Sequence, residues 1–195
     1  MRAKRTVVIM TVILSMILLT ASCAAPNDGT RTVQGFFGAL CELDFVQAGS
    51  FAGNEDLYSG IIAVLGGETG EGLYERIQST YFINFIYSNL EWKITSSEKT
   101  DDSYSVKVRI TAFVSDDILA AVRDGEKMTM ESPAYASADA DRQYMMLINN
   151  IPEVYGRLPD TVQTKTVTVT LKVVCENGTW HIVPTAELFS AIGGM

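Results

Sequence analysis

The sequence predicts an α+β domain in which N-terminal helices pack on an antiparallel sheet, with a helical insertion between the middle strands. Apolar residues recur at spacings of three and four between residues 30 and 87, which is typical of amphipathic helices. Polar and apolar residues alternate in the segments 90–114 and 166–183, which is typical of strands with one buried face. Asn177-Gly178 stands within the second alternating segment and favours a hairpin turn.

The composition is that of one folded domain. The chain has 195 residues, enough for a sizeable core, and its hydrophobic content is 47% against 19% charged residues. The net charge is −8 and the sequence contains no run of basic residues, so we expect no nucleic-acid partner.

The first 22 residues have the features of an export signal. A basic start is followed by the apolar run Thr6–Thr20 and by the small residues Ala21-Ser22. The string Leu19-Thr20-Ala21-Ser22-Cys23 resembles the lipobox of bacterial lipoproteins, in which cleavage before the cysteine leaves a diacylglycerylated sulfur at the new N-terminus. We therefore expect residues 1–22 to be a signal peptide, Cys23 to carry lipid, and residues 23–29 to form a tether outside the cytoplasmic membrane.

Two other interpretations of this segment remain open. It could be an ordinary secretory signal, or an uncleaved anchor, because the uncharged run Thr6–Ala25 is long enough to span a bilayer. Cleavage before Cys23 would remove three of the 15 basic residues and none of the 23 acidic ones, which gives a mature net charge of −11. Such a domain is expected to be held off an anionic membrane surface.

The first half of the domain, which we expect to span residues 30–195, is predicted to be helical. Thr30 or Thr32 can cap a first helix, whose apolar stripe is Val33, Phe36, Phe37, Leu40 and Cys41. A short helix over 44–51 would end at Gly53, and a third would cover 57–65. The glycine-rich stretch 66–72 lacks the Lys-Ser/Thr of a phosphate-binding loop. The longest helix is predicted over 71–87.

Two long strands are predicted next, over 90–94 and 104–114, followed by an insertion over 115–160. The insertion is expected to hold a short helix that ends at Asp124-Gly125 and a second helix that Pro152 stops. Four of the eight methionines lie in it: Met128, Met130, Met145 and Met146. They predict either an adaptable apolar surface or gap-filling under the sheet.

The last two strands are predicted with a defined register. A two-residue loop at Asn177-Gly178 would place Cys175 opposite Trp180 and Val173 opposite Ile182. The apolar face of this hairpin would carry Val167, Val169, Leu171, Val173, Cys175, Trp180 and Ile182. The opposite face would carry Thr166, Thr168, Thr170, Lys172 and His181.

Helices that precede an antiparallel sheet, and a final Gly-Thr-Trp-His-Ile strand followed by the helical Ala186-Glu187-Leu188-Phe189, resemble the nuclear-transport-factor-2-like superfamily. Within it, the chain is similar to uncharacterised lipoproteins of bacterial envelopes. The resemblance covers residues 30–195 and implies a cone: helices cover the concave face of a curved sheet, with a pocket open at one end. The long insertion departs from the family pattern. Because many functions use this fold, the resemblance implies no particular activity.

A ligand pocket, if the cone has one, is expected among five aromatic residues on predicted core faces: Phe37, Tyr81, Trp92, Tyr104 and Trp180. The alternative is that these residues only close the core. Cys41 and Cys175 also lie on predicted core faces, so they form either a disulfide or two buried thiols. With a single histidine, His181, and no calcium-loop spacing, we expect no metal and no cofactor.

On these grounds we expect a non-catalytic module, held to the membrane by lipid, that binds a small apolar ligand or an envelope protein. A second hypothesis is an assembly subunit that forms a homodimer through the face with Thr166, Thr168, Thr170 and Lys172. A third is a cone-fold enzyme such as an isomerase, for which Tyr81, Tyr104 and Asp44 are candidate polar residues. We expect no enzymatic activity.

Overall fold

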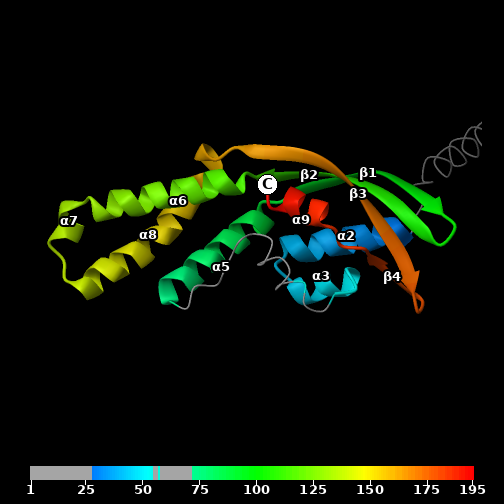
Figure 1. Ribbon diagram of the computed structural model, residues 1–195, viewed down its shortest axis with the longest axis horizontal. Helices are drawn as coiled ribbons and strands as arrows, with labels where there is room; N and C mark the ends of the chain where they lie inside the picture. Colours follow the sequence, from blue (N-terminus) through cyan, green and yellow to red (C-terminus); the bar gives the residue numbers. More distant parts are fainter. Residues whose placement is uncertain (1–27, 55–56, 58–71) are drawn as a thin grey trace, which may run out of the picture.

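The computed structural model describes residues 28–54, 57 and 72–195. Its elements are α2 (Asp28–Cys41), α3 (Phe45–Phe51), α5 (Leu73–Ser88), β1 (Glu91–Thr100), β2 (Ser103–Phe113), α6 (Ser115–Met130), α7 (Pro133–Ala136), α8 (Ala140–Thr161), β3 (Thr164–Glu176), β4 (Thr179–Ile182) and α9 (Ala186–Ile192). The described part is an α+β fold with a four-stranded antiparallel open sheet in the order β1-β2-β3-β4 (Figure 1). This confirms the predicted class.

The predicted register of the β3–β4 hairpin is confirmed. Cys175 pairs with Trp180 and Val173 with Ile182. Asn177 and Gly178 have φ values of 52° and 81°, the positive values that a type I′ turn requires. The apolar face is buried at its centre but not at its end: Cys175 is exposed and Trp180 only half-buried. Both flank the turn, at the end of the hairpin that lies farthest from α5 and α6 (Figure 1).

One face of the sheet carries the core. Helices α2 and α9 both pack on it, and α2 presents Val33, Phe36, Phe37 and Leu40, each with 0% of its surface exposed. Burial of each such side chain stabilises the fold by about 1.5–3 kcal/mol. The spacing-based prediction of this stripe is therefore confirmed. Within the described part of the chain, the middle of the opposite face, called the outer face below, is exposed and carries mainly threonine, serine, lysine and arginine.

The N-terminal helices begin and end close to the predicted positions. Helix α2 starts at Asp28, inside the expected tether, and Thr32 does not cap it but donates a hydrogen bond back to the carbonyl of Asp28 at 2.8 Å. Asp44 caps α3 by accepting a hydrogen bond from the amide of Gln47 at 2.9 Å. The helix predicted over 57–65 lies outside the described residues except for Leu57, which is buried.

The insertion forms a helical hairpin that continues past the end of the sheet (Figure 1). Helix α6 does not end at Gly125 but runs on to Met130. A Cβ at position 125 would collide with a methyl group of Val154 on α8. The glycine therefore permits the close approach of α6 to α8, and tertiary packing outweighs its low helix propensity.

Helix α8 also passes its predicted stop. It has 22 residues, runs through Pro152 and Pro159, and is longer than the 16-residue α5, which had been expected to be the longest helix. An internal proline removes one hydrogen bond and costs roughly 3 kcal/mol. Four buried side chains on α8 offset that loss: Ile151, Val154, Tyr155 and Leu158. Helix α5 lies alongside α8, so the hairpin is supported from the side (Figure 1).

The base of the hairpin is held to the sheet and to the C-terminal end of the chain. The amide of Val114 donates to the carbonyl of Gln163 at 2.9 Å, which ties the start of α6 to the residue before β3. The buried hydroxyl of Ser115 donates to the carbonyl of Gly193, just after α9. These bonds fix the direction in which the hairpin leaves the sheet.

Candidate functional site

The five aromatic residues expected to line one pocket lie in three separate places. Phe37 stacks on Trp92 in the core, with ring centroids 5.2 Å apart. Tyr104 meets Trp180 edge to face at 5.1 Å, near the two hairpin turns. Tyr81 belongs to the helical half, where its ring lies 5.6 Å from that of Tyr155. In the first two of these places the two rings pack against each other, as expected if the aromatic residues only close the core.

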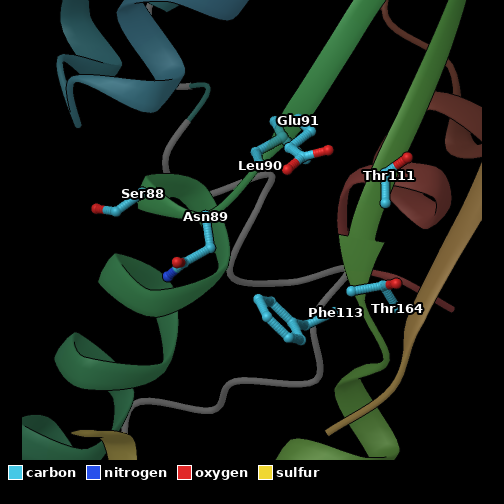
Figure 2. A pocket seen from close by; sticks show the side chains of 7 residues that line it. All are labelled: Ser88, Asn89, Leu90, Glu91, Thr111, Phe113 and Thr164. Carbon is cyan, nitrogen blue, oxygen red and sulfur yellow. The ribbon is translucent and has the colours of Figure 1, made fainter. Parts of the chain in front are cut away.

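A cleft of about 390 Å³ lies where α5 meets the sheet. Its described lining is Ser88, Asn89, Leu90, Glu91, Thr111, Phe113 and Thr164, and Figure 2 shows Phe113 directed from the end of β2 toward α5. The Phe113 ring packs on Phe85 with centroids 5.0 Å apart. Five of the seven described lining residues are polar, and none of the five predicted pocket residues is among the seven.

A polar cluster joins α5, α6 and α8. The hydroxyl of Tyr74 donates a hydrogen bond to Glu126 Oε1, and Gln78 Nε2 donates to the same oxygen at 3.0 Å. Burial and the adjacent carboxylate of Glu126 both raise the pKa of Tyr74, so its hydroxyl stays protonated and remains a donor. The cluster fastens α5 to α6 through one carboxylate oxygen.

Two further tyrosines of α8 complete this junction. The N-cap of α5 is Gly72, which has no side chain to accept a hydrogen bond from the first turn. The hydroxyl of Tyr144 takes this role by accepting a hydrogen bond from the amide of Tyr74 at 3.1 Å. Tyr155 is 6% exposed and its hydroxyl has no hydrogen-bond partner among the described residues. Burial, and secondarily the charge of Glu126, raise the pKa of Tyr155.

The far end of the hairpin exposes apolar side chains. Within the described residues, five of the ten large exposed hydrophobic residues belong to this region, which we call the hairpin end: Leu73, Met128, Met130, Tyr144 and Met145. Met128 is 69% exposed and Met145 48%. Met130 lies one turn beyond Glu126, and Tyr144 touches the start of α5. The first alternative for the methionines, an exposed adaptable surface, fits three of the four; Met146 is half-buried.

The two cysteines of the described part are both free thiols. Cys41, at the end of α2, donates to the carbonyl of Leu90 at 3.6 Å, and burial raises the pKa of its thiol. Such a thiol is a poor nucleophile. Cys175 lies on the predicted apolar face of the hairpin, but at its end beside the β3–β4 turn, where it is exposed and not buried as expected.

The other candidate polar residues do not converge. His181 is more enclosed than predicted: its side chain is 16% exposed, packs against Gly53 after α3, and lies 3.6 Å from a carboxylate oxygen of Glu176. Asp44 is exposed and occupied as the cap of α3, far along the chain from Tyr81 and Tyr104. Among the described residues no group of three or more His, Cys, Asp and Glu side chains could hold a metal ion.

No protein-family model matches the chain, and no curated protein matches it. Among solved structures, it is similar to the crystal structure of a "putative lipoprotein" (ycdA) from Bacillus subtilis subsp. subtilis str. 168, with a TM-score of 0.57 and 13% sequence identity. The similarity covers 84% of this chain and 55% of that one, so this chain spans about half the length of its structural neighbour. At this identity the similarity shows a shared fold alone. Within 28–54, 57 and 72–195, no helix combines the length and apolar character needed to cross a membrane.

Sequence reasoning missed the polar cluster and the separation of the aromatic pairs. The cluster had a signal: Tyr74 and Gln78 stand four residues apart in the predicted long helix, hence on one face. Their partner Glu126 lies about fifty residues away, beyond the point at which the first insertion helix was expected to end.

Proposed function

We propose that this protein is an extracytoplasmic lipoprotein, attached to the membrane by lipid on Cys23, and that its domain is a non-catalytic module that binds a partner protein through the hairpin end. The observation that carries the proposal is the exposure of Leu73, Met128, Met130, Tyr144 and Met145 at one end of the molecule. Methionine-rich exposed surfaces adapt to partner proteins at little cost in strain.

The position of the hairpin end relative to the anchor supports this role. Helix α2 begins at Asp28, where Gly29 contacts Tyr104 near the β1–β2 turn; the hairpin end lies at the opposite end of the long axis (Figure 1). Helix α6, with 16 residues, is about 24 Å long. Cys23 stands only five positions before Asp28, so lipid on Cys23 would hold the α2 start near the membrane and leave the hairpin end clear of the anchor.

The leader pattern supports the lipid anchor, as does the description of the structural neighbour as a lipoprotein. On the finer fold, we infer a variant of the nuclear-transport-factor-2-like cone. Helices α2 and α9 on one face of a twisted antiparallel sheet support it. The α6–α8 hairpin corresponds to the long insertion that departs from the family pattern.

The partner-binding proposal is tested in cells that make the full-length protein. A photoreactive amino acid at Met145 should crosslink one defined partner, while the same group at Met195, a methionine of similar exposure (44% against 48%), should not. The purified partner should then bind the Met195→Glu variant as tightly as the parent and the Met145→Glu variant at least tenfold more weakly. Equally tight binding of the partner by both variants would contradict the proposal.

A small ligand is the second candidate, and the cleft of Figure 2 is the specific observation in its favour. Its volume of about 390 Å³ falls in the range of ligand sites. Because five of the seven described lining residues are polar, the ligand would carry polar groups, whereas the sequence suggested an apolar ligand. Native mass spectrometry of the parent protein, with Thr111→Trp as a variant that fills the cleft, distinguishes this candidate: a co-purified small molecule that disappears in the variant supports it.

The homodimer and enzyme hypotheses receive less support. A two-fold interface through the outer face would bring Lys172 and its neighbouring cations toward the same cations of a second copy, which is unfavourable. The candidate catalytic residues Tyr81, Tyr104 and Asp44 belong to different places in the fold. We therefore retain a non-catalytic role.

A further inference from the structure

The sheet assembles a cationic stripe that no single segment of the sequence reveals. Lys93 on β1 pairs with Arg109 on β2, and Lys107 lies two residues from Arg109 on the same face. Lys172 on β3 pairs with Ser105, the next residue of β2 on that face. All four basic side chains are exposed on the outer face. They form a diagonal line across three strands, which we call the outer stripe: Lys93, Arg109, Lys107 and Lys172.

The spacing of the outer stripe follows from sheet geometry. Neighbouring strands lie about 5 Å apart, and residues on one face of a strand are about 7 Å apart. Successive cations of the stripe are therefore separated by roughly 5–8 Å along a line of about 20 Å. The separation between successive cations is shorter than or close to the Debye length of about 8–10 Å, so neighbouring charges act on one another.

The stripe lacks internal compensation. Within the described part of the chain, the ion pairs are Arg31–Asp28, Lys127–Glu131 and His181–Glu176, and none involves a cation of the stripe. On the outer face Glu91 lies two residues from Lys93 and Glu98 pairs with Ser105, so two carboxylates of the edge strand flank the stripe, and Glu176 lies beside the last turn. Like charges directly opposite each other, as at Lys93 and Arg109, destabilise a sheet. A protein with 23 acidic and 15 basic residues thus places four unpaired cations together at a cost in stability.

Hydroxyl groups lie beside these cations. Thr168 pairs with Arg109, Thr170 with Lys107, and Ser105 with Lys172. Both threonines are exposed. Arginine, lysine, serine and threonine side chains are the donors that proteins use on phosphate oxygens. Each anionic group placed over the stripe would meet a cation and a neutral donor together.

We propose that the outer stripe binds a linear chain of phosphate groups, such as polyphosphate. A chain fits better than an isolated ion because the four cations form an open line across the surface of the sheet. The contacts are electrostatic and independent of any base or sugar, so this site is separate from the hairpin end and does not depend on the role proposed for it.

The test uses the full-length protein held in nanodiscs of zwitterionic lipid, with fluorescent polyphosphate of about one hundred units as the probe. Anisotropy should show binding that weakens about 50-fold between 50 and 200 mM salt, as expected for about four phosphate contacts. The variant with Lys93, Lys107, Arg109 and Lys172 all replaced by Gln should lose binding at least 20-fold. Its melting temperature should not fall, because the substitutions also remove repulsion.

A matched control removes the same charge elsewhere. Arg76, Arg123, Arg142 and Arg157 lie on helices, and their joint replacement by Gln should change the affinity less than threefold. Equal losses of affinity in both variants would mean that binding depends only on net charge, which would overturn the proposal. Binding of tripolyphosphate as tight as that of the long chain would overturn the linear site, and equal binding of polyglutamate would overturn the preference for phosphate.

Anionic lipid headgroups are the competing occupant. In nanodiscs with 30% phosphatidylglycerol, labelling of Lys93, Lys107 and Lys172 by a soluble amine reagent should proceed as in zwitterionic discs. Protection of these three lysines by more than fivefold, with Lys127 unaffected, would show that the outer face lies on the membrane and would overturn the proposal.

Discussion

The Tyr74 hydroxyl donates its hydrogen bond to Glu126 across the gap between α5 and α6, and the charge of the same carboxylate also acts on Tyr155, whose hydroxyl has no hydrogen-bond partner among the described residues. Two tyrosines with similar surroundings thus contribute in opposite ways. One bond holds the hairpin to its lateral support, while the other hydroxyl is buried at a cost. Replacement of the two tyrosines by phenylalanine should therefore change the free energy of unfolding in opposite directions.

Tyr74→Phe should destabilise the protein. It removes a hydrogen bond to a charged group, which contributes about 1.5–3 kcal/mol. The free energy of unfolding, measured by urea titration at pH 7, should fall by an amount in this range. An unchanged midpoint would mean that the Tyr74–Glu126 bond is not formed in solution.

Tyr155→Phe should leave the stability at pH 7 unchanged or raise it. The buried hydroxyl has no partner, and an unpaired buried hydroxyl costs about 1–3 kcal/mol. The aromatic contacts with Tyr81 and Phe85 are retained by phenylalanine. A loss of more than about 1 kcal/mol in the same urea titration would show that the hydroxyl has a partner.

Stability should decline in alkali. Burial raises the pKa of both Tyr87 and Tyr155 above the ordinary tyrosine value. Between the unfolded and folded pKa values the unfolded chain releases protons that the folded chain retains, so stability is complete below pH 10 and is lost as the pH rises above it. Each tyrosine contributes a slope of about 1.4 kcal/mol per pH unit there. Urea titrations from pH 8 to 11 measure it, and Tyr155→Phe should make the decline shallower.

Gly125→Ala should destabilise the hairpin although alanine is the better helix former. The new Cβ would collide with the Val154 methyl group, and overpacking costs about 1–3 kcal/mol. The control is Gly156→Ala on α8, where nothing lies within 4 Å of the added carbon and a gain of about 0.5–1 kcal/mol is expected. Thermal unfolding should separate the two, and Val154→Ala should partly rescue Gly125→Ala.

The two thiols should react at different rates. Exposed Cys175 should be alkylated by a maleimide at least ten times faster than Cys41, whose thiol is half-buried, has a raised pKa and donates to Leu90. Mass spectrometry of the native protein without reductant gives both rates. Equal protection of the two sites, reversed by reductant, would instead reveal the disulfide that the sequence left open.

The sequence by itself determined the local elements whose causes are local. Asn177-Gly178 set both the turn and the register of the last hairpin, because positive φ at two consecutive positions leaves few alternatives. The stripe Val33, Phe36 and Leu40 set the buried face of α2, because helical periodicity alone places those side chains together. Asp44 set the start of α3 by its cap.

Only the tertiary structure decided where distant segments meet. Gly125 and Pro152 have the propensities of helix breakers, yet both lie inside helices, because burial between α6, α8 and α5 outweighs local preference. The aromatic residues expected in one pocket divide into pairs, because facing the core does not specify which ring is adjacent. The absence of a basic run concealed the outer stripe, since Lys93, Arg109 and Lys172 become neighbours only through strand pairing. Local rules act over a few residues, whereas contacts between elements depend on how whole surfaces fit.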